Sequence, residues 1–126
     1  DVTNGERNAK LLERLIQFAQ KTSVLCQKLP RTAVNQRIID QVVGSSDSMA
    51  ANYAEACEAE SADDFIHKIG IVRKEARETR VHLRILYSTN QTFRTEIVVL
   101  GKESVEYIKI FTTIYRNFKI GKKVNL

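Results

Sequence analysis

Small or apolar residues recur along residues 65–86 at alternating steps of four and three positions. The series consists of Phe65, Ile69, Val72, Ala76, Thr79, Leu83 and Leu86. Because an α-helix completes one turn about every 3.6 residues, this spacing aligns all of these side chains on one face. A face of this regularity is typical of the seam between packed helices, so the stretch predicts a long helix within a bundle.

Three more segments predict helices, and the connections between them are short. Pro30 closes the first segment, because the residue before a proline is displaced from helical geometry. Ser61 is followed by two aspartates and is a suitable N-terminal cap for the helix that starts there. The predicted helices span about residues 6–28, 32–59, 62–87 and 93–119. Residues 1–126 are therefore expected to form one all-α domain, an antiparallel up-down-up-down four-helix bundle.

The first predicted helix has an apolar face wider than one partner helix would cover, so we expect it to contact two neighbours. Its stripes consist of Leu12, Ile16, Ala19 and Cys26, and of Leu11, Leu15, Phe18, Leu25 and Leu29. The predicted seam of the second helix consists of Val34, Ile38, Val42, Ser45, Met49, Asn52, Tyr53 and Ala56. That of the fourth consists of Ile97, Leu100, Ile108, Phe111, Tyr115 and Phe118. The fourth helix is rich in residues that favour strands, but no matching strand occurs elsewhere.

Small side chains crowd the second half of the second predicted helix, so a neighbouring backbone can approach closely there. Asn52 lies on this seam, where its amide either hydrogen-bonds across the interface and fixes the register or reaches a ligand; we prefer the register. Glu55 follows one turn later, and we expect it to bond with an arginine or a tyrosine of an adjacent helix. The residues assigned to the seam and its register are Ser48, Asn52, Glu55, Phe65, Glu75 and Glu78.

Basic residues outnumber acidic ones, and the formal net charge of +5 makes nucleic acid a plausible partner without requiring it. The clearest basic feature is a stripe that lies one position after the seam of the third helix. It consists of Arg73, Arg77, Arg80 and Arg84. Such a stripe can contact phosphates. Lys119, Lys122 and Lys123 near the C-terminal end have no obvious acidic partner, which makes them better candidates for phosphate contacts.

The arginine stripe has a second interpretation, pairing with an acidic stripe on the second helix. The acidic stripe consists of Asp40, Asp47, Glu55 and Glu58. If the two helices run antiparallel, Asp47 lies opposite Arg73 or Lys74, and Asp40 lies near Arg80. Exposed ion pairs contribute only ~0–1 kcal/mol each, but they help to fix which helices are neighbours. We prefer this interpretation for the arginines.

No arrangement of residues in the sequence predicts catalysis or metal binding. Glu75, Glu78 and His82 share a helical face, but a di-iron bundle needs Glu-x-x-His motifs on two helices, and neither histidine has a glutamate three residues before it. We expect Glu78 to pair with His82 or with an arginine. Serine and cysteine triads and glycine-rich phosphate loops are also missing. The prediction is a protein that is not an enzyme and uses no cofactor and no metal.

Cys26 and Cys57 lie within apolar helical patterns, where a thiol is expected to be a small buried hydrophobe rather than a disulfide or redox group. The longest apolar runs are far shorter than the ~20 residues that a membrane span requires. No segment with the pattern of a secretory signal opens the sequence. We therefore predict a cytoplasmic protein that does not contact the membrane.

Four parts of the sequence together resemble one family. They are residues 48–56 (SMAANYAEA), Ser61, Asp64-Phe65-Ile66, and residues 71–79 (IVRKEARET). In this combination and over nearly the whole length, the chain resembles the bacterial four-helix bundle proteins encoded in intervening sequences of large-subunit rRNA genes. Many members of that family have glycine where this chain has Ala56.

The resemblance implies an antiparallel four-helix bundle that assembles into a ring, a homopentamer. It also implies similarity to the accessory protein of diversity-generating retroelements, a basic ring that binds a reverse transcriptase and nucleic acid. The predicted function is that of a non-enzymatic oligomeric interaction protein that binds RNA or DNA through the arginine stripe and the C-terminal lysines. The alternative is a scaffold that docks a partner protein without nucleic acid.

Overall fold

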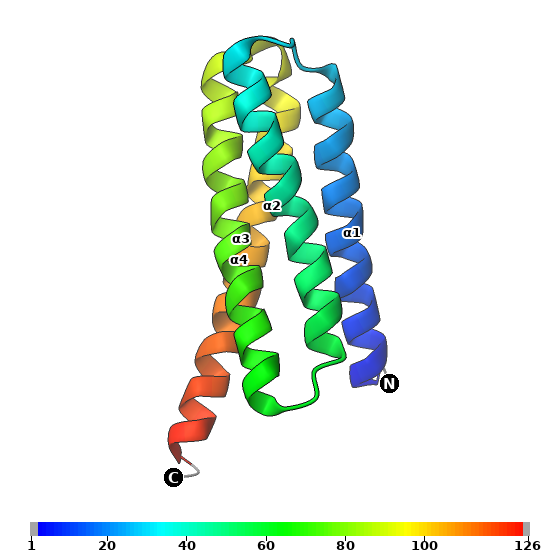
Figure 1. Ribbon diagram of the computed structural model, residues 1–126, viewed down its shortest axis with the longest axis vertical. Helices are drawn as coiled ribbons and strands as arrows, with labels where there is room; N and C mark the ends of the chain where they lie inside the picture. Colours follow the sequence, from blue (N-terminus) through cyan, green and yellow to red (C-terminus); the bar gives the residue numbers. More distant parts are fainter. Residues whose placement is uncertain (1–2, 125–126) are drawn as a thin grey trace.

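The computed structural model describes the backbone of residues 3–124 and the side chains of residues 3–121. Its helices are α1 (Asn4–Lys28), α2 (Ala33–Cys57), α3 (Ala62–Thr89) and α4 (Arg94–Val124), with a short 3₁₀ helix, η1 (Gln91–Phe93), before α4. No strand occurs among the described residues, so the prediction of an all-α chain with four helices is confirmed. Figure 1 shows that each long helix begins at the end of the molecule where the preceding one finishes.

Hydroxyl side chains cap the first three helices. The Thr3 Oγ1 accepts a hydrogen bond from the Glu6 amide at 3.1 Å, and the Ser61 Oγ accepts one from the Asp64 amide at 3.0 Å. Thr32 caps α2 in the same way through the Asn35 amide at 3.1 Å. Leu29, directly before Pro30, has extended geometry and ends α1. Each cap satisfies an amide that has no partner inside its own helix.

The last helix continues to Val124, beyond the predicted end near residue 119. The predicted end near residue 119 left Gly121 outside the helix. A glycine ends a helix when it adopts left-handed geometry, and no glycine among the described residues has a positive φ. Gly121 therefore continues the helix instead of ending it.

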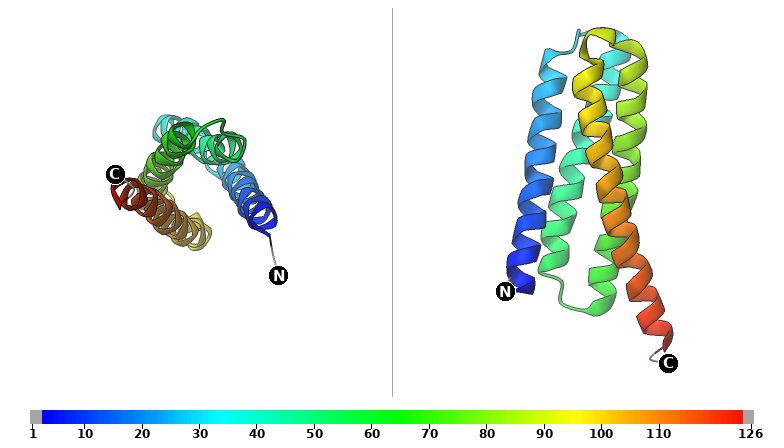
Figure 2. Two further views of the ribbon diagram at one scale, coloured as in Figure 1. Left: turned by 90° about the horizontal axis from the view of Figure 1, so that it is seen from below. Right: turned by 180° about the vertical axis from the view of Figure 1, so that it is seen from behind.

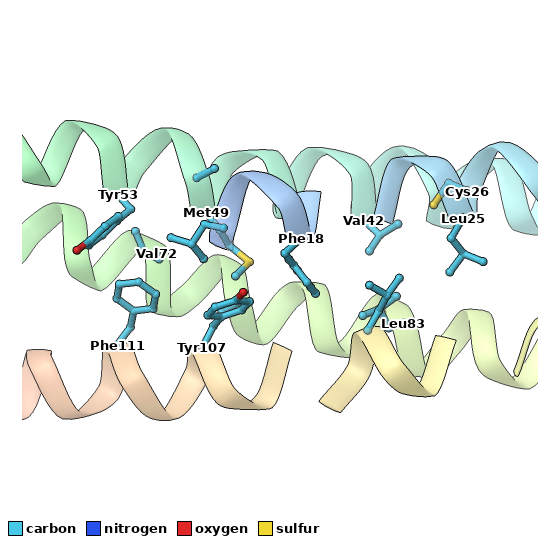
Figure 3. Packing of buried hydrophobic residues seen from close by; sticks show 14 of the residues in the cluster. Phe18, Leu25, Cys26, Val42, Met49, Tyr53, Val72, Leu83, Tyr107 and Phe111 are labelled. Carbon is cyan, nitrogen blue, oxygen red and sulfur yellow. The ribbon is translucent and has the colours of Figure 1, made fainter. Parts of the chain in front are cut away.

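The core runs along the length of the bundle and is closed by aromatic side chains from α1, α2 and α4 (Figure 3). Phe18 and Tyr107 meet edge to face, with ring centroids 5.3 Å apart, and Tyr53 and Phe111 do so at 5.5 Å. Edge-to-face contacts place the positive edge of one ring against the negative face of the other. The sequence pattern of α4 missed Tyr107 and Ser104, although both are fully buried.

The heptad-like series on α3 predicted its buried face well. Ile69, Val72, Ala76, Thr79, Leu83 and Leu86 are all buried. Phe65 is only partly buried and packs against Phe118, with ring centroids 6.2 Å apart, while the neighbouring Ile66 is buried. The predicted seam of α2 is wrong at its first member, because Val34 is 56% exposed and Asn35 is buried in its place.

Asn35 joins the two turns at one end of the bundle. Its Nδ2 donates to the Asn90 Oδ1 at 2.8 Å, and the Asn90 Nδ2 donates to the Asn35 Oδ1 at 2.9 Å. The same Asn35 Nδ2 also donates to the Pro30 carbonyl at 2.8 Å, and the Asn90 Nδ2 donates to the Leu86 carbonyl at 3.0 Å. Because both amides are buried and paired, this end of the bundle is held by polar contacts that tolerate little change.

Viewed along the bundle, the helices form an arc with α1 and α4 at its two ends (Figure 2). The link between these two helices consists of ion pairs and one buried tyrosine. The ion pairs are Arg14–Glu106 at 3.2 Å, Lys21–Glu103 at 2.8 Å and Lys28–Glu96 at 3.3 Å. Tyr107 donates to the Arg14 carbonyl at 3.3 Å and is also hydrogen-bonded to Glu103. We call this side of α4, together with Arg14, Lys21 and Lys28 of α1, the paired flank.

None of the helices described here is both long enough and apolar enough to cross a membrane.

Candidate nucleic-acid interface

The arginine stripe of α3 lies beside α4. Arg73 is partly buried, whereas Arg77, Arg80 and Arg84 are exposed. Arg80 and Arg84 line a hollow of about 460 Å³ together with Lys102 of α4. Lys119 lines another hollow, of about 350 Å³, with residues of α3 that include Lys74 and His67. We call this side of α4, with the four arginines of α3, the basic flank.

The predicted pairing of the arginine stripe with the acids of α2 is wrong. The ion pairs among the described residues include none between Arg73, Arg80 or Lys74 and an acid of α2. Asp47 lines a hollow between α1 and α2, and Asp40 accepts a hydrogen bond from Gln36 at 3.0 Å. A step of one residue rotates a side chain by about 100° around a helix, and this rotation turns the stripe towards α4 instead of α2.

Two cations, one from α3 and one from α4, lie over the ring of Tyr115 of α4. The Arg73 guanidinium lies 4.3 Å from the centroid of its ring, and the Lys119 ammonium lies 5.3 Å from it. A methyl group on Gly70 would lie 3.3 Å from the ring edge, so glycine at this position lets the ring rest on the backbone of α3. Tyr115, which the sequence predicted as a member of the α4 seam, therefore also holds Arg73 in place.

Tyr87 repeats this arrangement at the other end of the basic flank. The Arg94 guanidinium lies 4.6 Å from its ring centroid, and the Arg94 Nε donates to the Tyr87 carbonyl at 3.0 Å. The sequence interpretation missed Arg94 and Lys102 as members of this face. Helical spacing in α4 could have revealed Lys102, because it places Glu96, Glu103 and Glu106 on one side of the helix and Lys102 on another.

The register residues behave differently from their prediction. The Asn52 Nδ2 donates to the carbonyl and to the hydroxyl of Ser48, both at 2.9 Å, so its hydrogen bonds stay within α2 and the predicted bond across the interface is wrong. Ser45 and Thr79 share a hydrogen bond of 2.8 Å between α2 and α3 instead. Glu55 pairs with Lys68 of α3 at 3.3 Å, where an arginine or tyrosine was expected.

Glu75 and Glu78 lie on α3 close to His82. Burial and the neighbouring Glu78 carboxylate raise the pKa of Glu75 above its ordinary value. The predicted pairing of Glu78 with His82 or an arginine is wrong, because no such ion pair occurs among the described residues. The His82 Nδ1 is buried and has no hydrogen-bond partner. Glu78 also lines a hollow of about 330 Å³ with Arg73 and Arg77.

Several further sequence predictions concern lysines, cysteines and a metal. The side chains of Lys122 and Lys123 lie outside the described residues. Cys26 is buried, and burial raises its pKa to about 11, whereas Cys57 is exposed, so the prediction of a buried thiol is wrong for Cys57. Within residues whose side chains are described, no three His, Cys, Asp or Glu side chains are grouped so as to hold a metal ion.

Comparisons with known proteins agree with this architecture. The chain resembles the crystal structure of a protein of unknown function from the S23 ribosomal protein family of Bacteroides thetaiotaomicron, with 29% sequence identity and a TM-score of 0.74. The likeness covers 86% of this chain and 97% of the other. A comparison with curated proteins finds no match. A sequence model described as 23S rRNA-intervening sequence protein matches residues 7–113, and the chain therefore belongs to that family.

Proposed function

We propose that this protein is a non-enzymatic, oligomeric interaction protein that binds RNA or DNA electrostatically through the basic flank. The observation that supports this proposal best is the contrast in charge pairing. None of the four arginines of the stripe forms an ion pair with a described acid, whereas Glu96, Glu103 and Glu106 are all engaged on the paired flank. A cytoplasmic location is part of the proposal.

Unpaired guanidinium groups are well suited to phosphate. Each presents N–H donors in a planar fork that matches two phosphate oxygens, and it keeps its charge at any physiological pH. Binding also releases the counterions that surround the nucleic acid, which makes phosphate contacts strongly dependent on salt. Arginines that were already paired with carboxylates would lose those partners on binding and gain less.

The experiment compares two variants that each lose three positive charges. The first is Arg77→Ala/Arg80→Ala/Arg84→Ala on the basic flank, and the second is Arg14→Ala/Lys21→Ala/Lys28→Ala on the paired flank. Binding to a fluorescent RNA and a DNA of equal length is measured by anisotropy at about 50 mM salt. We expect the first variant to bind about 30-fold more weakly than the second, since each phosphate contact contributes roughly threefold.

The matched control separates a local contact from general attraction by net charge. Equal losses in the two variants would mean that only net charge matters, and they would remove the basic flank from the proposal. A wild-type protein that binds neither nucleic acid at low salt would remove the binding function altogether.

The oligomeric half of the proposal has its own support. A hollow of about 540 Å³ lies between α1 and α4, with Leu25 and Leu100 among its lining residues. Val24 and Val99 line it too and are 53% and 59% exposed. Exposed apolar surface of this kind is commonly covered by a partner subunit. We propose that copies of the antiparallel bundle cover it for one another in a ring, a homopentamer.

The alternative, a scaffold that docks a partner protein, is favoured by the same hollow if no second copy occupies it. Light scattering of the wild type and of the Val24→Glu/Val99→Glu variant distinguishes the two. A ring that dissociates into lighter species in the variant supports assembly through this hollow. A monomeric wild type would contradict the ring and leave the hollow to a different protein.

A further inference from the structure

Tyr87 lines the hollow of about 460 Å³ between α3 and α4 and is 40% exposed. The Arg94 guanidinium lies over its ring, 4.6 Å from the centroid. A planar ring has two faces, and a single guanidinium covers only one of them. The exposed part of the tyrosine is therefore available as a surface on which a second flat group can stack.

The floor of this hollow is aliphatic. Leu83 and Ile97 are buried at it, and Val98 is 38% exposed. Gly101 adds no side chain, and a methyl group at this position would project into open space. The volume falls within the range of about 300–1,000 Å³ that is common for small-ligand sites. The hollow therefore has room for a flat and largely apolar ring system beside Tyr87.

Three exposed cations complete the lining of the hollow. Arg80 and Arg84 lie one helical turn apart, about 6 Å along α3, and Lys102 comes from α4. The ion pairs between described residues include none of these three cations, and no acid is among the described residues that line the hollow. Charge complementarity favours a ligand that is flat and apolar in one part and anionic in another, and a nucleotide has both parts.

The form of the nucleic acid follows from the need to reach Tyr87. A base inside a duplex is already stacked on both faces and paired at its edge, whereas an unpaired base can stack on an aromatic side chain. Exposed cations with long side chains can also adjust to the backbone of a flexible strand. The side chains around the hollow include no carboxylate or amide that would select one base by hydrogen bonds, so we expect little sequence preference.

We propose that this hollow holds one unpaired base of a single-stranded nucleic acid, stacked on Tyr87, while Arg80, Arg84 and Lys102 contact the neighbouring phosphates. This inference rests on the proposed function, because it names the form of nucleic acid that the basic flank accepts.

The first test compares a single strand with a duplex on the wild-type protein. The probes are an RNA strand of about 12 nucleotides that carries 5-bromouridine, which crosslinks to a stacked aromatic ring on irradiation, and the same strand paired with its complement, at about 50 mM salt. We expect the single strand to bind about fivefold more tightly and to crosslink at Tyr87, as read by mass spectrometry. Equal or tighter binding of the duplex, or no crosslink at Tyr87, would overturn the inference and leave the proposed function intact. Absence of binding to both probes would overturn the proposed function itself.

The second test replaces the tyrosine, after thermal melting has shown that each variant is folded. Tyr87→Leu is expected to weaken single-strand binding by about tenfold and to leave duplex binding unchanged, because only the single strand loses a stacked base. Tyr87→Phe keeps the ring and is expected to bind as the wild type does. The bond from Arg94 to the backbone carbonyl of residue 87 remains possible in both variants. Equal losses on single strand and duplex would show that the substitution acts through Arg94 or the fold, and they would overturn the stacking role.

The third test fills the hollow without changing any charge. Gly101→Leu is compared with Gly44→Leu, since added side chains at both glycines would project into open space and Gly44 lies on α2, beside the hollow between α1 and α2. We expect Gly101→Leu to weaken single-strand binding by about tenfold and Gly44→Leu to have no effect. Equal effects of the two variants would overturn the inference. Unchanged single-strand affinity in Gly101→Leu, with an altered molecular mass by light scattering, would overturn it too and assign the hollow to a contact between copies of the chain.

Discussion

On its α1 side, α4 presents three glutamates that each lie within 3.3 Å of a basic group. On its α3 side, the Arg73 guanidinium lies over the ring of Tyr115, and none of the four arginines of the stripe forms an ion pair with a described acid. The paired flank also buries Tyr107, and the basic flank leaves Tyr115 partly exposed. One helix thus carries a side whose charges are neutralised within the molecule and a side whose charges are not. Net charge alone therefore does not indicate which side of the molecule can bind an anion, because that depends on whether each cation is already paired.

The largest difference between the two flanks is expected when the tyrosine of each flank is replaced by alanine. Tyr107→Ala removes a fully buried ring and is expected to lower the free energy of unfolding by about 3–5 kcal/mol, as for other buried aromatic side chains. Tyr115→Ala removes a partly buried ring and is expected to cost about 1–2 kcal/mol. Urea unfolding followed by circular dichroism measures both. Equal losses would show that the two flanks contribute equally to the core.

Alkaline pH should lower the free energy of unfolding through Tyr107 of the paired flank. Burial and the bond to Glu103 raise the pKa of Tyr107 above its ordinary value of 10.0. Above that pH the unfolded chain releases the tyrosine proton while the folded protein retains it, so the free energy of unfolding falls by up to about 1.4 kcal/mol per pH unit. Urea titrations between about pH 9 and 11 should show a shallower fall for Tyr107→Phe than for the wild type. Parallel pH profiles would contradict the assignment.

Removing acids should make the paired flank resemble the basic one. Glu96→Gln/Glu106→Gln frees Lys28 and Arg14 from their carboxylates without losing the shape of either side chain. We expect RNA to bind about tenfold more tightly at low salt, with a salt dependence that is steeper by about two phosphate contacts. Anisotropy titrations at several salt concentrations measure both quantities. Unchanged affinity would mean that pairing does not control access to phosphate.

The smallest expected effect is the change in the free energy of unfolding when a single cation is removed, and its sign should differ between the two flanks. Lys21→Gln removes an ion pair and is expected to lower the free energy of unfolding by up to about 1 kcal/mol. Arg80→Gln relieves repulsion from Arg77 and Arg84, which lie three and four residues away, and is expected to raise it by up to about 0.5 kcal/mol at low salt. Both changes should shrink at high salt. Losses of the same sign and size in the two variants would contradict the contrast in pairing.

Periodicity was sufficient to predict the helices and most of the α3 face, because burial repeats with the turn of the helix. It did not reveal which neighbour each side of a helix would face. The arginine stripe was predicted to face α2 because only the α2–α3 hairpin was considered. The stripe lies one residue after the buried seam of α3, and this rotation of about 100° around the helix directs it towards α4. Asn35 and Asn90 are far apart in the sequence, so their buried pairing follows only from the packed turns.

Lysine labelling of the wild-type protein, read by mass spectrometry with and without bound RNA, shows which flank the nucleic acid covers. Lys102 and Lys119 lie on the basic flank, and Lys21 and Lys28 on the paired flank. We expect RNA to protect Lys102 and Lys119 while Lys21 and Lys28 react as they do in the free protein. Protection confined to Lys21 and Lys28, or no protection at any of the four while RNA is bound, would contradict binding through the basic flank.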